Sequence, residues 1–186
     1  MTTRANRQAS ALAALSANEK ATVLDELLAT RPDLRQLAEN HAVRLMSAAD
    51  RTAVADDVAS ALRDLDIEEL NGHAGYRPRR GYVHPVEAAD EILDEALEPF
   101  LRDLERRAAL GMATAATELA AGILLGLYEC RDGGGETLLE YSPDYPAERA
   151  ADVVDRCAKL HVNLPRAEVL DLLTEWDGIV AGRAGA

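Results

Sequence analysis

The sequence predicts an all-α protein, built as a bundle or a short solenoid of antiparallel helical hairpins with six to eight helices. Three observations lead to this prediction. Helix-forming residues dominate, with 35 Ala and 27 Leu but only seven aromatic residues among 186. Apolar residues recur at helical spacing, and prolines stand where helices would begin. No segment alternates apolar and polar residues over the length of a strand with turn signals on both sides.

The first 70 residues are expected to form helical hairpins. Ser16 and Glu19 have the spacing of a capping box, so a helix should begin there. Pro32 ends that helix and opens the next, because proline is tolerated in the first turn of a helix but not in its interior. Asp50 is placed to cap a third helix. The apolar residues of this third helix recur at helical spacing: Val54, Val58, Ala61, Leu62 and Leu65.

A segment rich in Gly, Arg and Tyr at 71–84 is expected to be a loop and the main internal boundary. Three glycines and Pro78 within it cannot sustain a helix. A second helical lobe should follow at 85–180 and share one core with residues 1–70. The tail at 181–186 should fray.

Three prolines and one glycine define the helices of the second lobe. The apolar pattern that begins after residue 85 continues through Pro99, which favours one kinked helix over two separate ones. Gly111 is placed to end this helix. Pro146 and Pro165 should each open a further helix.

The segment 112–129 should be the buried central helix, because nearly all of its residues are small or apolar. Gly122 and Gly126 lie one turn apart in it. Such small residues let a neighbouring backbone approach closely.

Charge and cysteine content limit the class of protein. The chain has 33 acidic and 20 basic residues, and its net charge of -13 repels phosphate backbones and anionic membrane surfaces. We therefore expect neither nucleic acid nor a membrane as partner. No apolar run approaches the roughly 18 residues that cross a bilayer, and no signal peptide is recognisable, so we expect a cytoplasmic protein. The wealth of Ala and Arg is typical of GC-rich bacterial genes. Cys130 and Cys157 lack CxxC spacing and should be buried free thiols.

Four segments carry a resemblance to a known family: VLDELLATRPDLRQLAE, AVADDVASALRDL, Gly81-Tyr82-Val83 and ALEPFLRDLERRAALGMATAATELA. Their order between Leu24 and about Leu173 resembles the helical region that follows SWIM-type zinc fingers in many bacterial proteins. The last segment also reads like a tetratricopeptide or HEAT-type helix pair. The Cys-x-Cys and Cys-x-His zinc ligands of the SWIM element are absent, so no zinc function is carried over. The resemblance implies a helical-repeat scaffold of unassigned role.

Six carboxylates without a basic residue among them occupy the helix expected at 87–98: Glu87, Asp90, Glu91, Asp94, Glu95 and Glu98. We interpret them as the solvated face of an amphipathic helix. Two alternatives stay open. One is an aspartate-rich box that holds magnesium and diphosphate. The other is a metal-assisted hydrolase of the nucleotide pyrophosphatase type, in which Glu91 and Asp94 act with Asp152 and Asp155. The candidate metal ligands on this helix are Glu87, Glu91 and Asp94.

No signature of a nucleophile or of a zinc protease occurs in the sequence, so we expect no catalytic residue and no cofactor. Of the four scattered histidines, His84 directly precedes a proline at the expected start of a helix. A capping role is therefore favoured for it over a metal-binding one.

The only strongly positive segment contains Arg77, Arg79 and Arg80, bounded by Tyr76 and Tyr82. It can fold back on the acidic helix and neutralise it. Alternatively it can dock an acidic or carboxyl-bearing protein, with arginines supplying bidentate contacts and tyrosines supplying contact area. An RNA-binding patch is disfavoured, because the acidic helix would repel phosphate.

We therefore expect a non-catalytic helical protein-interaction module, acting as an adaptor or regulator, with a protein partner. Whether the chain also forms a homodimer stays open. The first alternative function is the metal-assisted hydrolase that uses the helix at 87–98. The second is an acidic mimic of nucleic acid that binds a basic DNA-binding protein.

Overall fold

The computed structural model describes residues 11–78, 81–133, 135 and 137–165, and singly 167, 169, 173, 176 and 178. The chain divides into two compact units, 1–45 and 46–186. This division lies earlier in the chain than the segment 71–84, where the sequence places the main boundary. The reason is that helices from both sides of 71–84 pack into one core.

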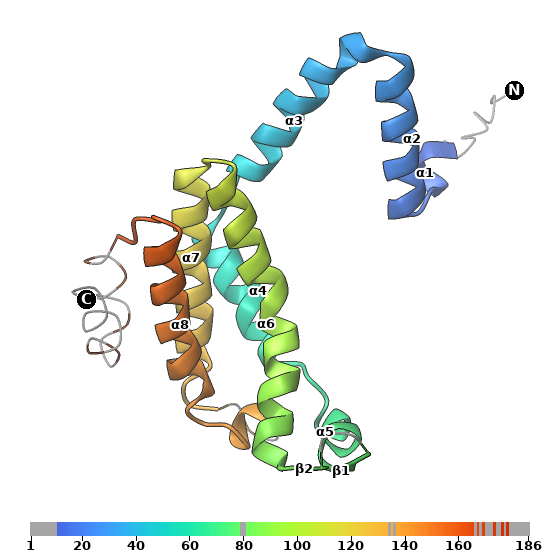
Figure 1. Cartoon of the computed structure of the whole chain (residues 1–186). Helices are drawn as coiled ribbons and strands as arrows, with labels where there is room; N and C mark the ends of the chain where they lie inside the picture. The colour runs from blue at the N-terminus through green and yellow to red at the C-terminus, as the bar shows by residue number, and fades with distance from the viewer. Residues whose placement is uncertain are drawn as a thin grey trace, which may run out of the picture. The chain divides into compact units, whose positions relative to one another are not determined.

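The prediction of an all-α fold is confirmed: the described part contains eight α-helices and a single two-stranded sheet (Figure 1). In the N-terminal unit lie α1 (Ala11–Ala14), α2 (Ala17–Thr30), the 3-10 turn η1 (Pro32–Leu34) and α3 (Arg35–Ser47), whose last two residues belong to the second unit. The second unit contains α4 (Arg51–Arg63), α5 (Ile67–His73), β1 (Gly75–Arg77), β2 (Gly81–Val83), α6 (Pro85–Ala109), α7 (Ala113–Glu129), η2 (Leu138–Glu140) and α8 (Tyr145–Lys159).

The helix ends agree with the local sequence signals. Ser16 and Glu19 form the predicted capping box at the start of α2, with the Ser16 backbone N–H donating to Glu19 Oε2 over 2.8 Å. Asp50 Oδ1 accepts hydrogen bonds from two backbone N–H groups in the first turn of α4. Pro99 lies inside one continuous α6, as predicted. Gly111, with a φ of 71°, follows the end of α6, and the next backbone N–H donates to the Arg107 carbonyl over 3.0 Å.

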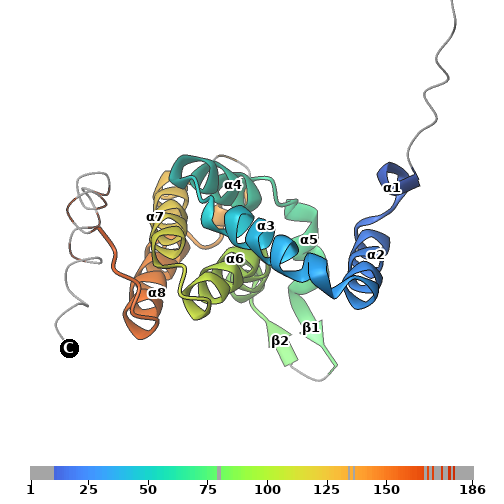
Figure 2. The ribbon, with the colours of Figure 1, turned by 90° about the horizontal axis from the view of Figure 1, so that it is seen from above.

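The second unit is a bundle in which α7 contacts α4, α6 and α8 (Figures 1 and 2). Most residues of α7 are buried, which confirms it as the central helix. At Gly122 and Gly126 the backbone of α4 comes so close that no Cβ would fit: one built on Gly122 would lie 2.7 Å from the Arg51 carbonyl oxygen. The close approach that these two small residues permit is therefore present, and the neighbouring backbone is that of α4.

The expectation of a loop without strands at 71–84 is wrong. Residues 75–77 and 81–83 pair as an antiparallel hairpin in which Tyr76 lies opposite Tyr82. Gly75 and Gly81 have φ values of 99° and 81°, which other residues rarely adopt. The first three residues of the segment, Gly72 among them, belong to α5, so the glycines do not exclude a helix throughout it. Gly75 and Gly81 instead permit a hairpin whose strands are too short to show an alternating pattern.

The remaining predictions concern the core and the end of the chain. Cys130 and Cys157 are buried and unpaired, as expected, and burial raises the pKa of the Cys157 thiol to about 12. In the segment predicted to be the last helix, Val169 and Leu173 are fully buried in the core. The tail at 181–186 lies outside the described residues. Among the helices described, none is both long and apolar enough to cross a membrane.

Candidate interaction surface

The β1–β2 hairpin presents two tyrosines side by side. Tyr76 and Tyr82 are directly opposed across the two strands, so their side chains share one face. Their exposed fractions are 82% and 68%. Val83 at the end of β2 is buried in the core and anchors the hairpin to the second unit. The hairpin therefore holds an aromatic pair in solvent on a fixed base.

Arg77 is the last residue of β1, and its side chain points toward α6, the helix that carries the six carboxylates. Its Nη1 lies 3.9 Å from Glu91 Oε2 on α6, and its Nη2 donates to the Gly72 carbonyl oxygen over 3.4 Å. One of the three predicted basic residues thus folds back on α6. Arg79 and Arg80 lie outside the described residues.

The hairpin leads straight into α6, and His84 joins the two. Its Nδ1 accepts a hydrogen bond from the Val86 backbone N–H over 3.4 Å at the start of α6, which confirms the predicted capping role. Pro85 follows in the first turn. The tyrosine pair is thereby attached to the longest helix of the bundle over a connection of one residue.

The candidate metal ligands on α6 do not converge. Glu87 is exposed in the first turn, Glu91 faces Arg77, and Asp94 faces α8. In the part of the chain that the structure describes, no group of three or more His, Cys, Asp or Glu side chains is arranged to hold a metal ion.

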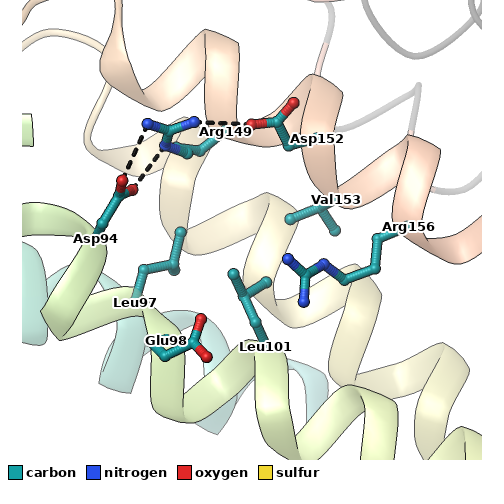
Figure 3. Close-up of a pocket in the computed structure, with 8 residues that line it drawn as sticks. All are labelled: Asp94, Leu97, Glu98, Leu101, Arg149, Asp152, Val153 and Arg156. Atoms are coloured by element: carbon teal, nitrogen blue, oxygen red, sulfur yellow. Dashed lines mark hydrogen bonds and ion pairs between the residues drawn. The ribbon is translucent and has the colours of Figure 1, made fainter.

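A groove of about 190 Å³ runs between α6 and α8, and an arginine bridges it (Figure 3). Arg149 Nε lies 2.8 Å from Asp94 Oδ1, and its Nη2 donates to Asp94 Oδ2 over 3.1 Å. Its Nη1 donates to Asp152 Oδ2 over 2.8 Å. Leu97 and Val153 line the groove beneath this network. One guanidinium therefore joins a carboxylate of α6 to a carboxylate of α8.

Tyr145 also belongs to this network, since it contacts both Asp94 and Arg149. It is buried, its hydroxyl donates to Asp94 Oδ1 over 3.0 Å, and the Arg149 guanidinium lies over its ring. Burial raises the pKa of Tyr145 and the adjacent Asp94 carboxylate raises it further, so the hydroxyl stays a proton donor. Burial lowers the pKa of Arg149, but its bonds to Asp152 and Asp94 more than offset this, so the pKa is raised and the guanidinium stays charged. Farther along the groove, Arg156 of α8 pairs with Glu105 of α6.

The groove brings together two of the four carboxylates that a pyrophosphatase-type site would use. Asp94 and Asp152 both contribute, but their oxygens are directed at Arg149 rather than at a common point between them. Sequence reasoning missed Arg149. Its signal was the pairing of Arg149 with Asp152 three residues later on a strongly amphipathic helix.

No protein-family model matches this chain, and no curated protein and no solved structure is similar to it at a significant level. The resemblance to the helical region that follows SWIM-type zinc fingers therefore stays a prediction.

Proposed function

We propose that this chain is a non-catalytic helical protein-interaction module that acts in the cytoplasm as an adaptor or regulator, and that it binds a protein partner through the β1–β2 hairpin. The observation that carries the proposal is the pair Tyr76 and Tyr82, opposed in register and exposed by 82% and 68%.

The tyrosine pair has the properties of an interface anchor. Tyrosine is enriched at the energetic centres of protein interfaces, because it supplies a large contact area and loses little conformational freedom. Two such side chains on one face of a hairpin form a compact apolar patch that a partner would desolvate. The hairpin is also held at its base, since Val83 is buried and the chain continues at once into α6. A preformed patch avoids the entropic cost of ordering a flexible loop.

The charges around the hairpin favour a partner that presents carboxylates. Arg77 forms an ion pair with Glu91 at 3.9 Å, which is beyond hydrogen-bond distance. In the sequence Arg79 and Arg80 follow directly between the two strands. Arginine beside tyrosine suits planar, bidentate recognition of a carboxylate.

The metal-assisted hydrolase has less support from the geometry. Two of its four carboxylates, Asp94 on α6 and Asp152 on α8, are already bound to Arg149, and a cation placed between them would have to displace the guanidinium. Mimicry of nucleic acid rests on the net charge of -13 alone.

The test is affinity capture from the native host at low salt, with partners identified by mass spectrometry. Tyr76→Ala combined with Tyr82→Ala should reduce recovery of the specific partner at least about tenfold, since an aromatic anchor typically contributes 2 kcal/mol or more. The free energy of unfolding of the same double variant should lie within about 0.5 kcal/mol of the wild-type value, because both side chains are exposed.

Tyr141→Ala is the matched control, because Tyr141 is also an exposed tyrosine of the second unit but lies outside the hairpin. It should leave capture unchanged. Equal recovery with the wild type and the Tyr76/Tyr82 double variant would refute docking by the hairpin.

A further inference from the structure

The helices of the N-terminal unit carry apolar stripes that this unit does not cover. On α2, Val23, Leu24 and Leu27 recur at helical spacing, and Leu24 and Leu27 are 48% and 45% exposed. On α3, Leu37 and Leu45 are 55% and 76% exposed. None of residues 11–45, all of which the structure describes, is buried.

The two helices do not cover each other. Within the unit α2 packs against η1 at the corner, and α2 and α3 diverge from there without packing along their lengths (Figure 1). Helical stripes of this width in a globular protein normally face another apolar surface. The unit is thus a splayed helical hairpin with both of its apolar stripes unpartnered within it.

The net charges of α2 and α3 have opposite signs. On α2 the exposed charged residues are mostly acidic: Glu19, Asp25 and Glu26 against Lys20. On α3 they are mostly basic: Arg35 and Arg44 against Glu39. Contact between two copies of α2 or between two copies of α3 therefore brings like charges together, whereas α2 against α3 pairs opposite ones.

The distribution of charge along the chain favours such a contact at this unit. Residues 1–45 carry six basic and five acidic side chains, so their net charge is +1 and the rest of the chain carries a net charge of -14. Two copies of residues 46–186 repel each other, whereas two copies of the N-terminal unit can approach at almost no electrostatic cost. The helices also match in length, with 14 residues in α2 and 13 in α3.

We infer that the N-terminal unit is a homodimerisation element, in which α2 of one chain packs on α3 of a second copy and a two-fold axis relates the two contacts. A two-fold axis uses the same surface twice, and here it places each acidic helix on a basic one and each apolar stripe on another. The inference rests on α2 and α3 alone and is independent of the docking proposed for the β1–β2 hairpin.

The test is sedimentation of the full chain over a range of concentrations. The wild type should sediment as a dimer, and Leu27→Glu should raise the dimer dissociation constant about 100-fold or more, since the substitution enters a symmetric interface twice. Ala29→Glu is the matched control, because it adds the same charge to the same helix outside the apolar stripe. It should remain dimeric. A wild type that is monomeric at every concentration, or equal dissociation constants for Leu27→Glu and Ala29→Glu, would overturn the inference.

Cysteine cross-linking tests the pairing of the helices. A mixture of Leu24→Cys and Leu37→Cys chains should form disulfide-linked dimers faster than either chain alone, because the native thiols are buried and do not compete. Faster linkage of Leu24→Cys to itself would overturn the pairing of α2 with α3. Leu27→Glu should still capture a partner through the hairpin, so loss of the dimer and loss of docking are distinguishable.

Discussion

Gly126 sets how closely α4 and α7 approach each other. A Cβ at this position would lie 2.6 Å from the Ala55 carbonyl oxygen and 2.7 Å from Val58 Cβ. Both of these atoms belong to the rigid inner face of α4, whose backbone cannot yield as a long side chain could.

Gly126→Ala should therefore destabilise the protein by about 1 to 3 kcal/mol, because the added methyl group forces the two helices apart. Gly72→Ala in α5 is the matched control. A Cβ there would meet nothing within 4 Å, and alanine favours a helix over glycine by up to about 1 kcal/mol. Urea unfolding of both variants measures the difference. If Gly126→Ala proved as stable as Gly72→Ala, the close crossing of α4 and α7 would be wrong.

Single residues were predictable from the sequence where their partners are local. The caps formed by Ser16, Asp50 and His84 each bond to groups two or three residues away, and short patterns encode them. Arg149 binds Asp94 across 55 positions. No periodicity on either helix indicates which arginine pairs with which carboxylate. The contact could therefore be identified only once the packing of α6 against α8 was known.

The bridge between α6 and α8 combines polar and apolar contacts. Arg149 bonds carboxylates on both helices, the Tyr145 hydroxyl donates to one of these carboxylates, and Leu97 and Val153 line the groove. Arg102 offers a contrast, because it pairs with Glu98 within α6 and is largely exposed.

Arg149→Met should cost about 1 to 3 kcal/mol of stability, since it leaves the Asp94 carboxylate and the buried Tyr145 hydroxyl with fewer partners. Arg102→Met removes an exposed pair within one helix and should cost less than about 0.5 kcal/mol. Thermal or urea unfolding of the two variants gives the comparison. Equal losses would show that the bridge does not fasten α8 to the bundle.

Long helices were predictable from the sequence, whereas the two strands were not. The apolar periodicity of α6 extends over many turns and carries the pattern through Pro99. Each strand of the β1–β2 hairpin has only three residues, too few for an alternating pattern. The pair Tyr76 and Tyr82 was singled out from composition and charge, but their opposition across the hairpin depends on positive φ angles at Gly75 and Gly81.

The molecule as a whole combines a packed helical bundle with two surfaces that a bundle alone does not explain. Residues 46–186 contain the core, with α7 at its centre. The exposed tyrosine pair lies on the hairpin of this unit, and the uncovered apolar stripes lie on α2 and α3 of the other. The apolar stripe on each of α2 and α3 is visible in the sequence as a helical periodicity. Whether a neighbour covers these stripes is not visible there, because burial is decided by tertiary contacts.

The most direct test of docking by the hairpin is hydroxyl-radical footprinting of the tyrosines with and without the captured partner. Tyr76 and Tyr82 should be oxidised readily in the free protein, and the partner should protect both, while Tyr141 reacts equally in the two states. Protection of α6–α8 groove residues with Tyr76 and Tyr82 still reactive would contradict the account and place the binding site at the Arg149 network.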